Sequence, residues 1–305
     1  MNNKWLTFAI VIIGLYLLSL GIVTLYNYEK GNFENDIAII PIKGPITMEG
    51  QSLGFGSGDS VSSNTIVSFI KEANNNPSVK GIILEINSPG GTVLASKEIA
   101  DEVKNSKKPV VAVIREFGAS GAYWIASATD YIIADQMSIT GSIGVIGSYL
   151  EFSGLFEEYG ITYQELKAGE YKDAGSPFKP LTPNERAFLQ KNINVIHEEF
   201  IQTVATNRNM SLENTRDIAD GRFYLGTEAK ELGLIDAYGN MDEGIKKVEE
   251  LANISNATTI RYEQEHSIFD VLTGVSAQGA YHFGRGFARE MSSISTEQTL
   301  QIRAE

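Results

Sequence analysis

The sequence predicts an α/β protein built around a mostly parallel sheet. Short apolar runs rich in β-branched residues alternate with amphipathic segments of helical length, which is the pattern of βαβ units. Several of these runs end in turns of glycine and serine, and ligand sites of parallel sheets lie beyond such strand ends. The chain has 305 residues, so it can form one large or two modest domains with ample core.

The alternation is clearest in the first half of the chain. Apolar runs predict strands at residues 37–42, 81–86, 110–114 and 131–134. Helical spacing predicts helices at residues 65–74, 92–105, 122–128 and 155–159, the second with Thr92 as its cap. Residues 50–63 are rich in glycine and serine and predict a loop. A phosphate-binding loop is not expected there, because these glycines neither follow a strand directly nor open a helix.

The second half begins with less regular segments. Residues 140–147 predict a tight turn and strand, and residues 162–168 an extended segment. Residues 169–177 are rich in turn formers. A long amphipathic helix is predicted at residues 182–207, where Thr182 and Glu185 have the spacing of a capping box.

The remaining predicted elements are a helix at residues 241–251 and a strand at residues 258–262. From residue 264 onward the chain is rich in serine, glycine and glutamine around an amphipathic stretch, residues 268–291. This part predicts a C-terminal tail, residues 264–305, with a peripheral amphipathic helix.

The first thirty residues predict a membrane anchor. The stretch from Trp5 to Tyr26 is almost wholly apolar, and no charged residue lies between Lys4 and Glu29. That length spans a bilayer as a helix. A cleaved signal peptide is the alternative, but the apolar run is longer than its usual apolar region and no clear Ala-x-Ala site follows.

The predicted organisation is therefore a cytoplasmic stub (1–4), a transmembrane anchor (5–27), a linker (28–36), one catalytic domain (37–263) and the tail. Lys4 and the terminal amine precede the span, so the positive-inside rule favours a cytoplasmic N-terminus. The protein is then expected in the cell membrane as a single-pass protein, with its main domain on the extracytoplasmic side.

Composition excludes several classes of function. The net charge of −13 and the pI near 4.8 argue against a nucleic-acid partner, which needs clustered lysine and arginine. The chain has no cysteine, so disulfides, thiolate metal sites and a cysteine nucleophile are excluded. The three histidines are scattered without ligand spacing, and none is expected near the candidate site. We predict no metal and no cofactor.

Ser120 is the candidate nucleophile. It lies among small residues where a predicted strand leads into a predicted helix. Such a turn presents the hydroxyl at the edge of the sheet, and the helix N-terminus offers unpaired N–H groups to a developing anion. The alternative is an ordinary turn in which Ser120 caps the helix.

A serine nucleophile needs a base, and lysine can replace histidine if burial lowers its pKa from about 10.4. The sequence by itself does not choose the lysine. Lys172 is the best placed, in a loop of small residues beside Tyr171 and Ala174, although a solvated loop lysine is the ordinary interpretation. Ser-x-x-Lys matches at 68–71 and 176–179 are interpreted as chance.

Five motifs together resemble the signal peptide peptidases of the SppA type from bacteria and archaea. They cover about residues 37–262 in the same order and spacing, and they fit the short form with a single catalytic repeat. The motifs are Ser88-Pro89-Gly90-Gly91, Gly118 to Trp124, Thr140 to Val145, Gly169 to Asp173, and the pair Asp220-Gly221-Arg222 and Gly233-Leu234-Ile235-Asp236.

The resemblance implies a role for five residues. Ser120 would be the nucleophile, Lys172 the general base, and Ser142 the residue that orients the lysine amine. The backbone N–H groups of Gly91 and Gly121 would form the oxyanion hole. The implied fold is that of the Clp protease and crotonase group, with repeated ββα units. The resemblance also implies ring-like homo-oligomers, in which serine and lysine can come from neighbouring subunits.

We therefore predict a membrane-anchored serine endopeptidase that degrades remnant signal peptides and other apolar peptides. The membrane lipid would be a partner through the N-terminal helix. One alternative is a related Clp-class protease that cuts a specific membrane-protein partner. Another is a crotonase-like acyl-CoA enzyme, or a non-catalytic member of the fold.

Overall fold

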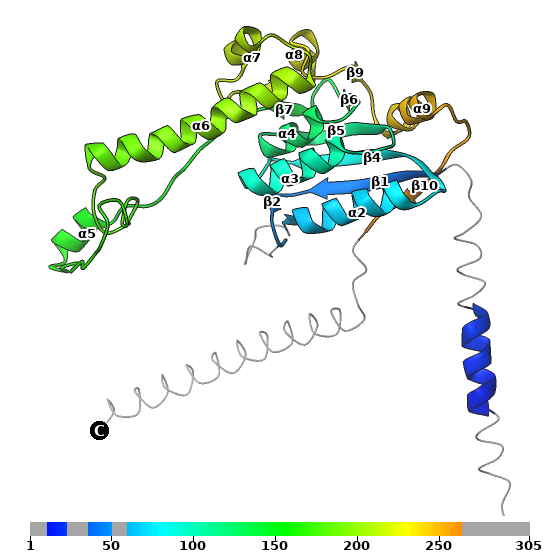
Figure 1. Cartoon of the computed structure of the whole chain (residues 1–305), viewed down its shortest axis with the longest axis horizontal. Coiled ribbons are helices and arrows are strands. Elements are labelled where there is room, and N and C mark those ends of the chain that lie inside the picture. The colour runs from blue at the N-terminus through cyan, green and yellow to red at the C-terminus, as the bar shows by residue number, and fades with distance from the viewer. Residues whose placement is uncertain (1–10, 23–35, 51–59, 264–305) are drawn as a thin grey trace, which may run out of the picture. The chain divides into compact units, whose positions relative to one another are not determined.

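A parallel sheet forms the centre of the protein in the computed structural model, which describes residues 11–22, 36–50 and 60–263 (Figure 1). Neighbouring strands along its main path are all parallel. In spatial order they are β10 (Thr258–Arg261), β1 (Asp36–Lys43), β4 (Val79–Ser88), β5 (Val110–Ala119), β6 (Tyr131–Ala134) and β9 (Ala237–Tyr238). The predicted α/β class with a mostly parallel sheet is confirmed.

β5 changes its neighbour along its length. Its first half pairs with β6, and Phe117 to Ala119 pair instead with β7 (Ile139–Gly141). β7 in turn pairs in antiparallel fashion with β8 (Phe223–Leu225). This arrangement places the end of β5, where Ser120 follows, between the ends of β4 and β7. A separate two-stranded sheet joins β2 (Ile46–Thr47) and β3 (Val61–Ser62).

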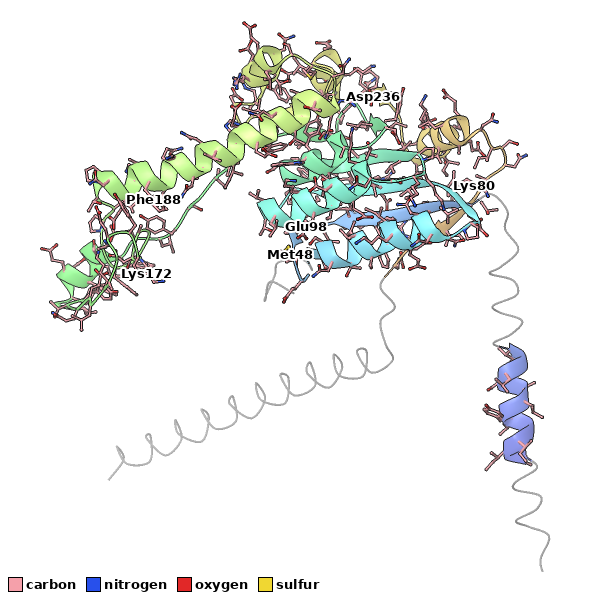
Figure 2. The ribbon with its side chains drawn as sticks, viewed as in Figure 1. Met48, Lys80, Glu98, Lys172, Phe188 and Asp236 are labelled. Atoms are coloured by element: carbon pink, nitrogen blue, oxygen red, sulfur yellow. The ribbon has the colours of Figure 1, made fainter. Side chains whose placement is uncertain are left out.

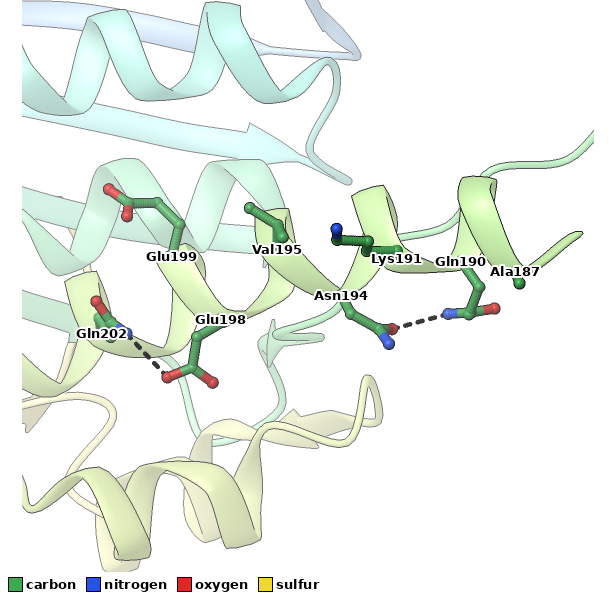
Figure 3. A pocket seen from close by; sticks show the side chains of 8 residues that line it. All are labelled: Ala187, Gln190, Lys191, Asn194, Val195, Glu198, Glu199 and Gln202. Atoms are coloured by element: carbon green, nitrogen blue, oxygen red, sulfur yellow. Dashed lines mark hydrogen bonds between the residues drawn. The ribbon is translucent and has the colours of Figure 1, made fainter. Parts of the chain in front are cut away.

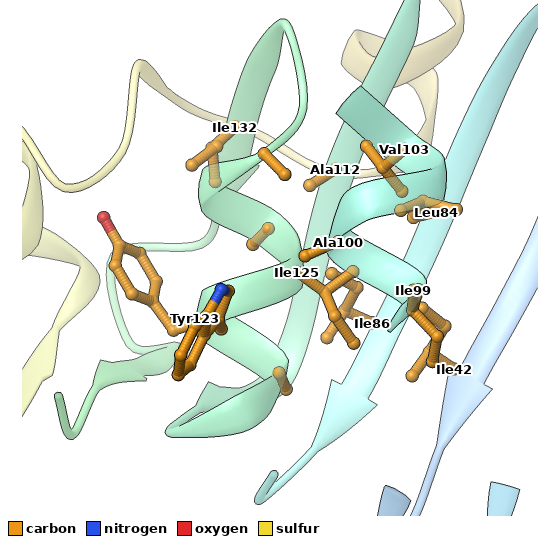
Figure 4. Packing of buried hydrophobic residues seen from close by; sticks show 14 of the residues in the cluster. Ile42, Leu84, Ile86, Ile99, Ala100, Val103, Ala112, Tyr123, Ile125 and Ile132 are labelled. Carbon is orange, nitrogen blue, oxygen red and sulfur yellow. The ribbon is translucent and has the colours of Figure 1, made fainter. Parts of the chain in front are cut away.

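Helices cover both faces of the main sheet. α2 (Ser63–Asn75), α3 (Val93–Lys104) and α4 (Gly121–Ser127) pack on one face, where the larger apolar core lies. α9 (Met241–Ala252) packs on the other face through Val248. Strands buried on both faces are near-continuous β-branched runs, as parallel sheets require. Figure 4 shows Ile86 of β4, Ile99 of α3 and Ile125 of α4 meeting in the larger core.

A projecting segment, called here the arm (residues 146–195), contains α5 (Ser153–Glu158) and the first half of α6 (Pro183–Asn207). Figure 1 shows it extending beyond the edge of the sheet. Only one residue of the arm, Glu185, is buried. The second half of α6 is anchored to the domain, because Phe200 stacks on Trp124 of α4 with ring centroids 4.4 Å apart.

Most of the predicted elements are confirmed, and the differences have local causes. The Thr182–Glu185 capping box is present, with both reciprocal hydrogen bonds. Thr92 occupies the cap position of α3, but its side chain makes no cap hydrogen bond. Residues 162–168 form no strand, because no neighbouring strand pairs with them. Between β7 and β8 the chain lies outside the sheet. Short elements were missed, among them α7 (Leu212–Ile218) and α8 (Gly226–Glu231).

Part of the predicted organisation lies outside the described residues. Residues 11–22 are helical, whereas the rest of the predicted anchor, most of the linker and the tail are not described. In the ranges that are described, no helix is long and apolar enough to cross a membrane. Contacts divide the chain into two units, Met1–Tyr262 and Glu263–Glu305. The predicted domain boundaries remain predictions.

Candidate active site

Ser120 occupies a strained turn between β5 and α4. Its backbone has φ 53° and ψ −125°, a region that residues with a side chain rarely adopt. The turn is held on both sides, because the Ser120 N–H donates to the Gly141 carbonyl at 2.8 Å and the Ser120 carbonyl accepts from the Trp124 N–H at 3.0 Å. A strained serine between a strand and a helix is the geometry of an exposed nucleophile.

The side chain of Ser120 is not used as a helix cap. It makes no cap hydrogen bond to α4, and its hydroxyl has no hydrogen-bond partner within the described part of the chain. The interpretation of Ser120 as an ordinary capping residue is therefore wrong. Ser120 as a whole is half-buried, and its hydroxyl is available for chemistry.

Two glycine residues after β4 pack directly on this turn. Gly90 has φ 101°, and a Cβ added there would lie 2.7 Å from the Gly121 nitrogen and 2.9 Å from the Ser120 Cβ. The Gly91 nitrogen lies 3.3 Å from the position that a Cβ of Gly121 would take. The close approach of the two segments therefore needs glycine on both sides.

The amides of Gly91 and Gly121 thus flank Ser120. Neither N–H has a hydrogen-bond acceptor among the residues that the structure describes. Gly121 is the first residue of α4, so its N–H also lies at the positive end of the helix. Two unpaired donors beside a free hydroxyl can stabilise an oxyanion formed on an acyl group.

Ser142 lies on the other side of Ser120, one residue after β7. Its backbone N–H donates to the Arg222 carbonyl at 2.9 Å, and its hydroxyl donates to the Gly221 carbonyl at 3.3 Å. The motif Asp220-Gly221-Arg222, which the sequence singled out, therefore supports the turn that carries Ser142. Four of the five predicted site residues come together at the ends of β4, β5 and β7.

Lys172 is placed elsewhere. It lies in the loop of the arm, with an exposed side chain, and Figure 2 shows it near α5 and Phe188, away from the sheet. No described contact joins Lys172 to Ser120 within one chain. Lys167 and Lys179 are both paired with Asp173, whereas Lys172 has no ion-pair partner among the described residues.

One expectation about histidine is corrected. His197 of α6 lies near the site, because its Nε2 is 3.2 Å from the carbonyl oxygen of Ile143, the residue after Ser142. No local sequence pattern signals this contact, since 54 residues separate the two positions. His197 is hydrogen-bonded to the backbone there and links α6 to the strand end that carries Ser142.

A pocket of about 700 Å³ on α6 is not the candidate site. Figure 3 shows that its lining comes from one face of that helix alone. Four of its polar side chains are hydrogen-bonded in pairs, Gln190 to Asn194 and Gln202 to Glu198. None of the predicted site residues lines it.

Replacing Gly91 by alanine is expected to lower kcat by about 10²- to 10³-fold, the effect of losing one oxyanion donor. The added Cβ would lie 2.0 Å from the Ile46 carbonyl oxygen, so the backbone must shift and take the amide with it. Peptide hydrolysis and circular dichroism would be measured together. Gly154→Ala is the matched control, because a Cβ there meets nothing within 4 Å. A Gly91→Ala protein with the wild-type kcat would contradict a role for this amide.

A free serine hydroxyl on a strained strand-to-helix turn, with two unpaired amides beside it, defines a serine hydrolase with an α/β fold. Comparison with known families makes this specific. The Clp protease model matches residues 54–136, and the model of peptidase family S49 matches residues 102–255, about half of the chain. The chain belongs to peptidase family S49 and is a serine peptidase.

Relatives agree with this assignment. A protein of Methanocaldococcus jannaschii named as a protease, MJ0651, is 41% identical over 222 residues, which are 72% of this chain and 71% of that one. A protein of Enterococcus faecium named as a signal peptide peptidase SppA is 33% identical over 250 residues, 81% of this chain and 72% of that one. Protease 4 of Haemophilus influenzae is 33% identical over 236 residues, 76% of this chain but 37% of its own length. The resemblance to the SppA type is confirmed.

Proposed function

We propose that the protein is a membrane-anchored serine endopeptidase with a Ser120–Lys172 dyad. The observation that carries the proposal is the free Ser120 hydroxyl beside the unpaired amides of Gly91 and Gly121. This arrangement supports acyl transfer, because it supplies a nucleophile and two backbone donors close to it.

The reaction has two steps, acylation of Ser120 and hydrolysis of the acyl-enzyme. The neutral amine of Lys172 takes the proton of Ser120 while Oγ attacks the scissile carbonyl carbon. The oxygen of the tetrahedral intermediate accepts hydrogen bonds from the two glycine amides. When the intermediate collapses, the Lys172 ammonium returns the proton to the leaving amine, and the acyl group stays on Ser120. Water then loses a proton to Lys172 and attacks the ester carbonyl. As the bond to Ser120 breaks, the Lys172 ammonium returns that proton to Oγ, and the second product leaves with the free enzyme restored.

The position of Lys172 supports a dyad shared between two copies of the chain. The arm that carries it exposes many large apolar side chains, far more than a solvated segment needs. They include Ile146, Leu150, Leu155, Tyr159, Ile161 and Leu166. In a homo-oligomer this surface would be buried against a neighbour, and the arm of one copy would carry Lys172 to the Ser120 of the next. Ser142 of that neighbour would accept a hydrogen bond from the lysine amine.

Membrane anchoring is proposed on the sequence and on the described helix. Residues 5–26 would form a helix of about 33 Å, close to the thickness of a bilayer core of about 30 Å. In the described part, residues 11–22, the side chains of Val11, Leu15 and Leu18 are exposed, as lipid contact requires. The anchor would hold the peptidase domain at the outer face of the cell membrane, where released apolar peptides remain.

The substrate assignment is tested with the full chain in phospholipid vesicles. Two peptides of equal length are compared, one an apolar signal-peptide sequence and one with every third apolar residue replaced by serine. We expect the apolar peptide to be cleaved at least about tenfold faster in kcat/KM, since apolar side chains gain binding free energy when they leave water on the enzyme. Equal rates would contradict the apolar preference, and no cleavage of either peptide would contradict the endopeptidase assignment.

A further inference from the structure

The loop that carries Lys172 is fastened to α6 by the two residues beside the lysine. Tyr171 packs its ring on Phe188 of α6, with centroids 5.1 Å apart. Asp173 pairs with Lys179, and the Nζ of Lys179 lies 2.7 Å from Oε1 of Glu185 in the first turn of α6. Figure 2 shows Lys172 and Phe188 at the same end of the arm. We call these five side chains (Tyr171, Asp173, Lys179, Glu185 and Phe188) the Lys172 clamp.

The clamp contains ion pairs in addition to the hydrogen bonds that the start of a helix requires. Glu185 Oε2 already accepts from the Thr182 N–H at 2.9 Å, its part of the capping box, and also from the Thr182 hydroxyl at 2.8 Å. Its other oxygen is used for Lys179. The carboxylates are largely removed from water, with side-chain exposures of 9% for Asp173 and 5% for Glu185. Buried charges are costly unless paired, so each of these groups holds the others in place.

The same pairs keep the clamp charged, and Lys172 takes part in none of them. The bonds from Lys167 and Lys179 lower the pKa of Asp173, and those to Asp173 and Glu185 raise the pKa of Lys179. Lys179, with the Thr182 hydrogen bonds, lowers the pKa of Glu185 to about 2. A lysine held by two carboxylates is a poor base, because its charged form is stabilised. Lys179 is thus suited to hold the loop and unsuited to take a proton.

We propose that Tyr171 and Asp173, through Phe188 and through the Lys179–Glu185 pair, are positioning residues that fix Lys172 on the N-terminal end of α6. The inference rests on the proposed function of Lys172 as the base. α6 has 25 residues, about 37 Å as a helix, and its other end is held to α4 by the stacking of Phe200 on Trp124. The clamp therefore fixes the position of the lysine relative to α6, which packs on α4 directly after the Ser120 turn of its own chain.

The test uses the full chain and pairs each disruptive change with a conservative one. Lys179→Met and Tyr171→Ala are expected to lower kcat about tenfold to a hundredfold, the effect of a misplaced catalytic group, with KM within about twofold. Lys179→Arg keeps the charge and Tyr171→Phe keeps the ring, so both should retain most of the wild-type kcat. Glu185→Gln keeps the capping box and loses the charge, and should behave as Lys179→Met does. Lys191→Ala, an exposed lysine of α6, is the control.

A second readout separates positioning from general damage. Each clamp substitution is repeated in a Lys172→Ala background, where a residue that acts only through Lys172 should cost nothing further. A wild-type kcat in both Lys179→Met and Tyr171→Ala, beside a Lys172→Ala protein that keeps only a small residual kcat, overturns the clamp and leaves the dyad standing. A loss that persists equally in the Lys172→Ala background also overturns it. A fully active Lys172→Ala protein instead overturns the proposed function.

Discussion

Replacing Ser120 by alanine is expected to lower kcat by about 10⁶-fold, the scale of losing a serine nucleophile, while the protein stays folded. Ser120 makes no cap hydrogen bond, and its hydroxyl has no partner among the described residues, so its removal breaks no described contact. Alanine keeps the same Cβ in the same strained backbone. KM should change little, since the hydroxyl contributes to the transition state rather than to binding.

Ser120→Gly extends the same prediction to stability. This variant should be equally inactive but at least as stable as the wild type. Relief of about 1–3 kcal/mol of backbone strain offsets the roughly 0.5–1 kcal/mol of extra chain entropy that glycine brings. Hydrolysis of an apolar fluorogenic peptide and the melting temperature would be measured together.

The control for both changes is Ser68→Ala, because Ser68 belongs to a Ser-x-x-Lys match and its hydroxyl donates to the Thr65 carbonyl on the exposed side of α2. Ser68→Ala should behave as the wild type. Activity in Ser120→Ala comparable to the wild type would mean that another group is the nucleophile.

The sequence was sufficient to predict the turn around Ser120, because the residues that determine this turn are neighbours along the chain. A β-branched run, two glycines and a short apolar helix determine where β5 ends and α4 begins. The close approach of Gly90 and Gly91 followed from topology, since the ends of neighbouring parallel strands meet at one edge. The sequence could not show that the hydroxyl of Ser120 is free of the helix cap, because both interpretations use the same residues.

The features that were missed depend on contacts between distant residues. The link from His197 to Ile143 and the pairing of β7 with β8 have no local pattern. Residues 162–168 have the composition of an extended strand but no neighbouring strand to pair with, so they form none. The position of Lys172 in space is the most important feature that the sequence did not predict. Its loop was predicted, but the direction of the arm depends on how α6 is seated against Trp124.

Mixing two inactive variants is expected to restore activity if the dyad is shared between copies. Ser120→Ala retains Lys172, and Lys172→Ala retains Ser120, so an intact pair forms wherever the first donates its arm to the second. Random co-assembly in a ring gives about one quarter of the wild-type sites, since each site draws its serine and its lysine from two subunits. The physical reason is the separation of the two residues in one chain, where no described contact joins them.

The variants are co-expressed with different affinity tags, purified through both tags, and assayed on the same peptide. Ser120→Ala co-expressed with the double variant Ser120→Ala/Lys172→Ala is the control, because no subunit then carries the serine. The same experiment can test the clamp. Tyr171→Ala should lower the restored activity when it is added to the Ser120→Ala subunit, which supplies the lysine, and should have no effect on the other. Mixed assemblies that stay inactive would show that serine and lysine must come from one chain, and the arm would then have to fold back onto its own domain.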